Sequence, residues 1–423
     1  MFKFVAALLA ATSCGAMASA QEASTEARQI SGPLLTLDEA VVLAGGSAPA
    51  AEAASAGVDA ADAGRRIAGL RPNPALAVEV ENFVGTGPYS GVNGADVTAS
   101  VAIPIELGGK RQARIGVADA EAFRARLAQS IAGADIRLQV TELYIEAAAA
   151  EVRVAVAEDR FRIAGDTARA ATIRVQAGRA SPLEQERAEV ARLTAEADAG
   201  KARRIADAVR ANLGRRIGRP ATGPIDVAVL GGPGRGAMGP PRPATATGTL
   251  ALAAADADLK IADAGVAFAR SQRVPDLTVG PGVRRIEATN DVAAIFSVSV
   301  PLPLLNNGRA AVDQASANRR RADARRRMTV LDVEQQIAEV EVEAQNAAEA
   351  AHVASGPALS AAMEAARIAR IGYREGKFGQ LELLDAERVL TEMRVASIDA
   401  LATYQLAKAR LERLTAPAPI EGN

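Results

Sequence analysis

Apolar and polar side chains alternate along two pairs of short segments, one pair in each half of the chain. The first pair covers 75–84 and 97–103, where Val and Leu alternate with Glu, Thr, Ser and Ala. The second pair covers 277–280, where Pro281 interrupts the alternation, and 292–300. Alternation over about ten residues predicts strands with one apolar face, the pattern of outer-membrane strands. A soluble antiparallel sheet with one wet face fits this alternation equally well. The expected turn sites are Asn93-Gly94 and Asn290-Asp291.

Beyond the strands, apolar positions recur every three or four residues over very long stretches. The first stretch runs from about Gln112 to Gln176, which predicts a helix on the order of 95 Å long. The second half repeats the pattern over 330–351 and, for a returning helix, over 383–414. A mean step of about 3.5 residues predicts left-handed coiled-coil packing. Near the start, Thr36 with Glu39 forms a capping box that predicts the beginning of an earlier helix.

The two halves repeat one layout, 197 to 199 residues apart. Ile103-Pro104-Ile105 returns as Val300-Pro301-Leu302, and Gly178 returns as Gly376. Each half predicts two strands, a very long Ala-rich helix, a Gly-containing turn and a second long helix. The predicted organisation is a signal peptide (1–20), a first repeat (21–218), a Pro/Gly-rich connection (219–247), a second repeat (248–416) and a flexible tail (417–423).

Composition excludes several classes of protein. Aromatic residues make up 3% of the 423 residues and Trp is absent, so a thick conventional core is poorly supplied, whereas Ala-rich helices can pack closely side by side. The formal net charge is -1, which gives no global field for nucleic acid. The arginines at 319–321 and 325–327 are expected to form interhelical ion pairs and not a nucleic-acid site. One Cys and one His rule out a disulfide framework, a His/Cys metal cage and a confident nucleophilic triad, so we expect no cofactor, no bound metal and no enzyme.

The first residues predict export from the cytoplasm. Lys3 supplies a positive start, an apolar stretch follows, and Ala18-Ser19-Ala20 forms a small-residue cleavage site before Gln21. Cys14 offers a competing interpretation, because the residues before it loosely resemble a lipoprotein cleavage box, in which this cysteine becomes lipidated. Simple removal of Cys14 with the signal peptide is the favoured outcome.

No later window holds the roughly 18 to 20 apolar residues that a membrane-spanning helix needs, so a bilayer span has to be made of strands. Four strands cannot close a barrel, and an open edge is not tolerated in lipid. The chain is therefore expected to borrow strands from copies of itself, and three copies give 12 strands around an aqueous lumen. Glu79, Glu81 and Arg284 are the predicted lumen-facing charges.

The residues resemble a known family. The signal peptide, the duplicated strand-strand-helix-helix layout and the Gly-containing turns resemble the TolC family of outer-membrane efflux channels over essentially the whole mature chain. Arg71-Pro72-Asn73-Pro74, followed by Glu106-Leu107-Gly108-Gly109-Lys110-Arg111, is similar to the CzcC-like branch, which serves heavy-metal resistance pumps. The fold expected from this resemblance is mainly α with membrane strands: a homotrimer with a 12-stranded barrel, continued by an α-helical coiled-coil tunnel across the periplasm.

The resemblance also implies roles for residues at the turns between the long helices. In the family these turns meet the hairpins of a periplasmic adaptor and close the tunnel. Tyr373 matches the gate tyrosine, Glu184 matches its acidic hydrogen-bond partner, and Phe378 stands where the best-known member has a gate arginine. Glu382 and Asp385 match an acidic ring, six carboxylates in a trimer, whose mutual repulsion is expected to raise some of their pKa values. The alternative for these two is that they are ordinary first-turn acids of a helix. The implied docking residues are Gly178, Ser181, Leu183, Gly376, Gly379 and Leu381.

The function that the resemblance implies is passive export of divalent cations such as cobalt, zinc or cadmium through the outer membrane. The implied partners are two further copies of the chain, a periplasmic adaptor (membrane fusion protein), an inner-membrane RND pump and outer-membrane lipid, without nucleic acid. A TolC-like channel for drugs or other small organic molecules is the main alternative. A periplasmic adaptor is less favoured because it would carry a lipoyl-like β domain, and a purely structural coiled coil would need neither the paired strands nor the repeat.

Overall fold

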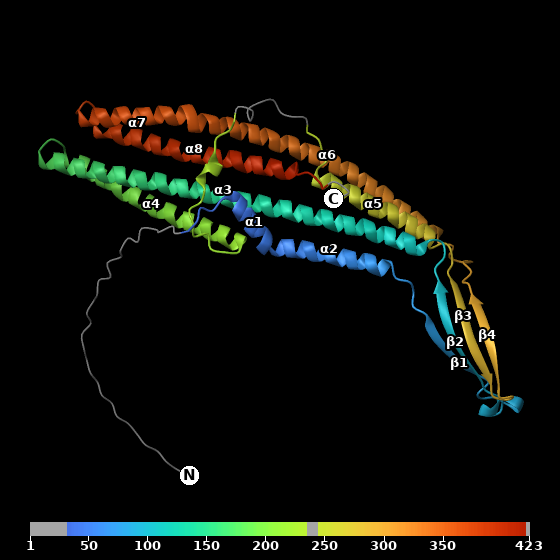
Figure 1. Cartoon of the computed structure of the whole chain (residues 1–423). Helices are drawn as coiled ribbons and strands as arrows, with labels where there is room; N and C mark the ends of the chain where they lie inside the picture. The colour runs from blue at the N-terminus through green and yellow to red at the C-terminus, as the bar shows by residue number, and fades with distance from the viewer. Residues whose placement is uncertain (1–31, 235–243, 420–423) are drawn as a thin grey trace, which may run out of the picture.

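The computed structural model describes residues 32–234 and 244–419 as long helices with a small sheet at one end (Figure 1). The predicted signal peptide and Cys14 lie outside the described residues, as do residues 420–423 of the predicted tail. The helices are α1 (Leu37–Ser47), α2 (Pro49–Ala68), α3 (Lys110–Gln176), α4 (Pro182–Ile217), α5 (Leu250–Ser271), α6 (Arg309–Val353), α7 (Leu359–Arg374) and α8 (Gln380–Leu414). The strands are β1 (Ala75–Glu81), β2 (Asp96–Ile105), β3 (Leu277–Ile286) and β4 (Asp291–Ser299).

The four strands form one antiparallel sheet in the order β1-β2-β3-β4, which projects from one end of the helices (Figure 1). The predicted strand pairs are confirmed. Pro281 interrupts the alternation but not the strand, because β3 continues through it to Ile286. The effect of Pro281 on the sheet is confined to two positions. β3 pairs with β2 on either side of Gly280 and Pro281 but not at these two residues. Proline has no N–H to donate to the ladder, which accounts for the gap.

The register separates the sheet into an apolar face and a polar face. Val78 lies opposite Ala99, Ala99 opposite Val283, and Val283 opposite Ala294, so apolar side chains share one face. Glu79 lies opposite Thr98, and Thr98 opposite Arg284, so charged and hydroxyl side chains share the other. The apolar face is largely exposed in the single chain, whereas Thr98 and Gly280 on the polar face are buried.

The long helices pair as two hairpins, α3 with α4 and α7 with α8 (Figure 1). The predicted first helix is confirmed, with 67 residues and no break. The expected counterpart in the second half is interrupted, because a π-helical turn, η5 (Ala354–Ala358), separates α6 from α7. Pro357 lies inside this turn, and proline removes one helical hydrogen bond and crowds the preceding carbonyl. The two hairpins are therefore built differently despite the repeat.

Alanine supplies much of the buried surface between the helices. Ala147, Ala148 and Ala149 of α3 are almost completely buried, and Ala366 of α7 and Ala407 of α8 are fully buried. Side chains this small let helix axes approach closely, as the composition predicted. Larger apolar residues gather where α1 and the connection between the repeats cross α3 and α4, and this cluster includes Tyr144, Leu213, Ile217, Ile225 and Ile398.

Tyr144 anchors that crossing point. Its hydroxyl donates to the carbonyl of Leu35 at 2.6 Å and accepts from the N–H of Asp226 at 3.0 Å. Leu35 and Ile225 also form a parallel bridge. The connection is thus tied down here, with a short 3-10 turn, η3 (Val227–Leu230), while residues 235–243 are outside the described chain. Burial raises the pKa of Tyr144 to about 12, so this hydroxyl keeps its proton at physiological pH.

The ends of the helices and repeats also have defined contacts. Thr36 caps α1, with its hydroxyl accepting from the N–H of Glu39 at 3.3 Å, as predicted. The reciprocal bond of a capping box, from the N–H of Thr36 to the Glu39 carboxylate, is replaced, because this carboxylate accepts from Arg219 at 2.6 Å. At the far end, Ala418 donates to the carbonyl of Gly248 at 2.9 Å, which places the first residues of the predicted tail against the start of the second repeat.

Ion pairs join neighbouring helices in both repeats, and in the first repeat Asp62 of α2 pairs with Arg126 of α3 at 3.0 Å. Arg65 of α2 pairs with Asp119 of α3, whereas Asp263 of α5 pairs with Arg319 of α6. Arg326 of α6 also pairs with Asp256 of α5. Arg319 and Arg326, two of the six arginines at 319–321 and 325–327, thus form interhelical ion pairs as predicted, whereas Arg327 pairs with Asp323 of its own helix. Within residues 32–234 and 244–419, no helix combines the length and apolar character that crossing a bilayer requires.

Candidate functional site at the hairpin tips

Both hairpins reverse direction through the same backbone turn. Gly178 and Gly376, 198 positions apart, have φ of 68° and 72°, a left-handed conformation that glycine adopts without strain. In each turn a residue after the glycine donates to a carbonyl five residues earlier, Arg179 to Arg174 and Lys377 to Gly372, both at 2.8 Å. These bonds satisfy carbonyls that the end of a helix leaves free. The predicted tips are therefore equivalent in backbone.

The side chains of the two tips differ. In the first, Ser181 caps α4 by accepting from the N–H of Glu184 at 3.4 Å; in the second, Gly379 occupies the cap position without a side-chain bond. Leu183 and Leu381 are 56% and 66% exposed, so each tip presents one leucine to solvent. All six predicted docking residues lie at these two turns.

Phe378 gives the second tip a feature that the first lacks. Its ring lies directly against the backbone of Gly372, where an added Cβ would overlap the ring. The N–H of Phe378 also donates to the Gly372 carbonyl at 3.2 Å. The corresponding residues of the first tip are Ala180 and Arg174, which cannot make this contact. Phe378 is still 44% exposed, so one edge of the ring remains accessible at the tip.

Tyr373 and Glu184, the predicted gate pair, lie on different hairpins close to the tips. Tyr373 is buried on α7 and packs with Ala369 and Leu383, while the guanidinium of Arg174, from α3, lies 4.8 Å above its ring. Gln380 of α8 donates to the backbone carbonyl of Glu184 at 2.8 Å. Among the described residues, the Tyr373 hydroxyl and one Glu184 carboxylate oxygen are buried without a hydrogen-bond partner. The predicted bond between them is therefore not made in this single chain.

The two residues of the predicted acidic ring have different surroundings. Asp385 accepts from Arg388 at 2.8 Å on the same helix, and Arg388 also bonds Glu392 at 2.7 Å. The hydrogen bond that Arg388 donates to Asp385, followed by the one it donates to Glu392, raises the pKa of Arg388. Glu382 lies in the first turn of α8, with its carboxylate over Gly379. An acid in this position also interacts favourably with the helix N-terminus.

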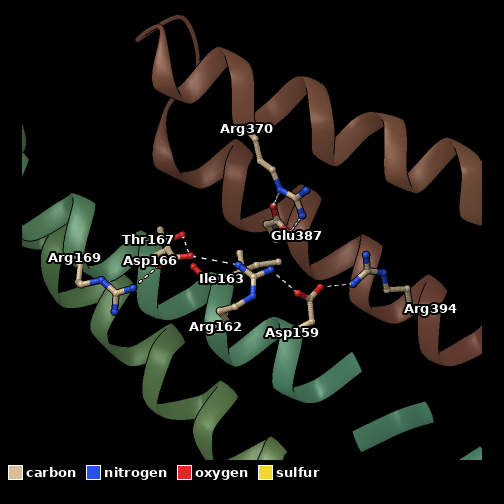
Figure 2. Close-up of polar contacts among 9 residues, drawn as sticks. All are labelled: Asp159, Arg162, Ile163, Asp166, Thr167, Arg169, Arg370, Glu387 and Arg394. Carbon is tan, nitrogen blue, oxygen red and sulfur yellow. Dashed lines mark hydrogen bonds and ion pairs between the residues drawn. The ribbon is translucent and has the colours of Figure 1, made fainter. Parts of the chain in front are cut away.

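An ion-pair network that the sequence did not reveal joins the two hairpins just behind the tips (Figure 2). Asp159 of α3 accepts from Arg394 of α8 at 2.7 Å and from Arg162 of its own helix at 2.6 Å. Burial acts to raise the pKa of Asp159, but the hydrogen bonds from Arg394 and Arg162 together outweigh it and lower that pKa. Within the second hairpin, Arg370 of α7 binds both carboxylate oxygens of Glu387 of α8. Hydrogen bonds to Glu387 raise the pKa of Arg370.

Further ion pairs continue this contact between α3 and α8 toward the sheet. Arg153 pairs with Asp399 at 2.5 Å, and Asp135 pairs with Arg413 at 2.6 Å. We call this α3–α8 contact, from Asp135–Arg413 to Asp159–Arg394, the hairpin seam. Next to Asp159 on the tip side is a cavity of about 420 Å³, whose lining includes Asp166, Arg370, Tyr373, Arg374 and Leu383. Ion pairs thus join the two hairpins along the seam, and the cavity lies between the seam and the tips.

The predicted lumen charges lie together on the polar face of the sheet. Arg284 bonds Glu81 at 2.8 Å and the hydroxyl of Thr98 at 2.9 Å, while Glu79 lies opposite Thr98 on the same face. The structure therefore brings all three predicted charges to one surface. In the described parts of the chain, no three His, Cys, Asp or Glu side chains converge closely enough to hold a metal ion.

Duplicated strand pairs, long Ala-rich hairpins and matched glycine turns define a class of elongated channel-type proteins, and comparison with known sequences agrees. The profile of the outer membrane efflux protein family matches residues 41–219 and 247–416, and the chain belongs to this family. Its members are outer-membrane components of tripartite efflux systems, which are transport conduits and not enzymes.

Comparison with individual proteins shows how far the similarity extends along the chain. The chain is 31% identical, over 90% of both chains, to the cobalt-zinc-cadmium resistance protein CzcC of Cupriavidus metallidurans. Among solved structures it resembles the outer membrane protein VceC of Vibrio cholerae, with a TM-score of 0.71 and 19% identity over 90% of this chain and 96% of that one. It also resembles the solved structure of CusC, with a TM-score of 0.73 and 15% identity over 90% of this chain and 92% of that one. The fold resemblance to the TolC family is therefore confirmed.

Proposed function

We propose that the chain is the outer-membrane channel of a tripartite efflux system that exports divalent heavy-metal cations of the cobalt, zinc and cadmium type. The observation that carries this proposal is the similarity to CzcC, which extends over 90% of both chains and so includes strands, hairpins and tips. The chain has one His and one Cys, so it offers few soft ligands. Metal choice accordingly belongs to the inner-membrane pump, and the channel is a passive conduit.

The working assembly in this proposal is a homotrimer. A four-stranded sheet with two free edges and an apolar face is incomplete in lipid, and three copies supply 12 strands. The polar face then lines the lumen, where Glu79, Glu81 and Arg284 meet the passing ions. Arg284 is paired with Glu81, so of the two predicted lumen carboxylates Glu79 is the one left to attract cations.

The hairpin tips form the periplasmic gate and the adaptor-docking surface in this proposal. Glu382 and Asp385 of three copies approach the axis as six carboxylates, which concentrate cations in a narrow passage. At the tip the two hairpins are held by Gln380, which donates to the carbonyl of Glu184, and by Arg174, which lies over the ring of Tyr373, so the two proposed gate residues each take part in a contact between hairpins. The hairpin seam, through Asp159 and Arg394, supports this closed arrangement from behind.

The partners follow from the same arrangement. A periplasmic adaptor engages the exposed tips, where Leu183 and Leu381 offer apolar contacts, and an RND pump in the inner membrane supplies the cations and the energy. The channel spans from the outer membrane into the periplasm, with the sheet in lipid and the tips facing the adaptor.

Deletion of the gene tests the substrate. We expect lower tolerance to cobalt, zinc and cadmium salts and unchanged tolerance to organic toxicants, with metal tolerance restored by the unsubstituted gene. A Leu183→Glu/Leu381→Glu chain should fail to restore metal tolerance. The matched control is Val42→Glu on α1, a residue 74% exposed and away from the tips, which should restore it. Unchanged metal tolerance with new sensitivity to organic compounds would instead assign the channel to drugs.

A further inference from the structure

The two repeats differ where a strand of the sheet passes into a long helix. We call the passage from β2 to α3 the first junction (106–109) and the passage from β4 to α6 the second junction (300–308). Each ends at a glycine in the left-handed conformation, Gly109 and Gly308, both with φ of 72°. The same backbone turn therefore precedes both helices, and the difference lies in the residues before it.

Charged side chains close the first junction. Lys110, the first residue of α3, is buried with its ammonium 2.8 Å from Asp276, and the N–H of Leu107 donates to the same carboxylate at 3.1 Å. The side chain of Glu106 is 13% exposed and accepts from Arg114 at 2.6 Å. Two acids thus satisfy the polar groups around this junction within the chain.

The second junction is apolar where the first is charged. Its sequence is Val-Pro-Leu-Pro-Leu-Leu-Asn-Asn-Gly, and no charged residue occurs from Val292 to Gly308. Leu302 and Leu304 are 74% and 84% exposed, and Leu305 is fully exposed. A patch of exposed apolar side chains marks a surface that contacts a membrane or another protein.

The ion pair of the first junction has no equivalent that could close the second. Asp276 comes from Pro275-Asp276-Leu277 before β3, and the corresponding segment before β1 is Pro74-Ala75-Leu76, where alanine replaces the acid. Arg273 donates to the carbonyl of Asn307 at 3.3 Å, but this bond lies at the end of the junction and leaves the leucines uncovered. The second junction therefore keeps an apolar surface.

The leucines continue the apolar face of the sheet toward the helices. Val298 lies opposite Val279, and Val279 opposite Ile103, so this face remains apolar at the end of the sheet nearest the helices. The chain then passes through the second junction into α6, at the place where the sheet projects from the helices (Figure 1). The exposed leucines therefore lie at the boundary between the sheet and the helices.

Polar residues follow the leucines directly. The side-chain oxygen of Asn306 accepts from the N–H of Gly308, and that of Asn307 accepts from the N–H of Arg309, both at 3.1 Å. Arg309 is the first charged residue after the uncharged stretch. Apolar side chains followed at once by amides and an arginine are suited to a membrane–water interface, where a long cationic side chain reaches the headgroups.

We propose that the second junction is a lipid anchor, in which Leu302, Leu304 and Leu305 lie among the acyl chains of the periplasmic leaflet of the outer membrane. This inference rests on the channel proposed above, in which the apolar face of the sheet meets lipid, and it extends that contact beyond the strands. The first junction, whose charges are paired within the chain, stays in water. Only one junction of each chain thus holds the protein in lipid.

Fluorescence quenching of the full-length chain in phospholipid vesicles tests this position. A Leu305→Cys chain labelled with bimane should lose emission when the vesicle lipid is replaced by dibrominated phosphatidylcholine, and iodide in the water should leave it unchanged. Val42→Cys on α1 is the matched control, because Val42 is 74% exposed, as Leu302 is, and lies away from the sheet. Its label should be quenched by iodide alone. The unsubstituted chain, which carries Cys14, sets the labelling background.

A second pair of variants tests whether the leucines hold the protein in the membrane. Leu304→Asn/Leu305→Asn should raise the fraction of protein that urea releases from the vesicles several-fold, because two apolar side chains leave the acyl region. Val42→Asn should release no more than the unsubstituted chain. Equal release of all three proteins would overturn the anchor.

The remaining outcomes separate the anchor from the channel. A trimer in vesicles whose label at residue 305 is quenched by iodide would place the leucines in water. A trimer whose label neither quencher reaches would place them against protein. Either result would overturn the anchor and leave the channel proposal intact, whereas a chain that does not enter vesicles would reject the channel proposal and the anchor with it.

Discussion

Asp159 of α3 and Arg394 of α8, 235 positions apart in sequence, form a 2.7 Å ion pair that joins the two hairpins immediately behind the tips. The side chains of both are about a third exposed, so the bond is partly screened by water. Replacing Arg394 by Ala should cost about 0.5 to 1 kcal/mol of local stability. We expect a leakier tip, seen as sensitivity to vancomycin in cells that carry the variant. Arg367→Ala, which removes bonds to Glu364 within α7 alone, is the matched control and should leave cells resistant.

The same pair predicts a pH dependence. The folded-state pKa of Asp159 lies below its ordinary value of 3.8, so its contribution to stability is fully present above pH 3.8 and is lost as the pH falls through the lower folded-state pKa. Thermal unfolding of the wild type and of Asp159→Asn should therefore differ by a constant amount between pH 7 and 5. The difference should shrink below pH 3.8. A difference that vanished between pH 7 and 5 would contradict the assignment.

Gly372 and Phe378 should behave as a coupled pair. Gly372→Ala places a methyl group in the space of the Phe378 ring, so the second tip should loosen and trypsin should cut faster at Lys377. Adding Phe378→Ala should return cleavage toward the rate of the single Phe378→Ala variant, which defines the coupling. Gly116→Ala, in a helix with open space around the site, should be neutral or stabilising by up to about 1 kcal/mol.

Removing the Tyr144 hydroxyl should loosen the crossing of α1 and the connection. Tyr144→Phe removes the hydroxyl bonds to the carbonyl of Leu35 and the N–H of Asp226, which still bond each other at 3.2 Å, so the expected cost is about 0.5 to 1.5 kcal/mol. Thermal unfolding should show the loss, and limited proteolysis should show earlier cleavage within the connection. Tyr404→Phe on α8, a partly exposed tyrosine, serves as the control and should change neither measurement.

The acids of the second tip should affect ions more than folding. If Glu382 and Asp385 line the gate, Glu382→Gln/Asp385→Asn should reduce cation selectivity of the purified protein in planar bilayers, with little change in melting temperature. Glu186→Gln/Glu189→Gln on α4 of the first hairpin is the control. Equal selectivity in all three proteins would support the simpler role of first-turn acids.

Local pattern was sufficient to predict the strands, the long helices and the glycine turns, because each depends on periodicity or on a special backbone conformation. Pro281 interrupts the alternation of apolar and polar residues that predicts the strand, but the pairs on either side hold β3 in place through it. Gly356-Pro357 carried a signal for the break between α6 and α7 that the helical spacing obscured.

The contacts between hairpins could not be predicted in the same way. Charged residues make up 23% of the chain, so each long helix offers many arginines and acids at suitable spacing. Which of them meet, as Asp159 meets Arg394, depends on the axial offset between α3 and α8, and no periodicity encodes that offset. The placement of Tyr373 and Glu184 close to the tips of different hairpins was predictable by position, but the missing hydrogen bond between them was not.

The pairing of Arg65 with Asp119 and of Asp263 with Arg319 has a consequence for how a duplicated chain tells its halves apart. If α2 packed on α6 during folding, Arg65 would meet Arg319, and two like charges side by side disfavour that exchange. The pair Asp62–Arg126 has the polarity of the second repeat and does not oppose the exchange. Recognition of the correct half at this level of the helices therefore depends on Arg65 and Arg319.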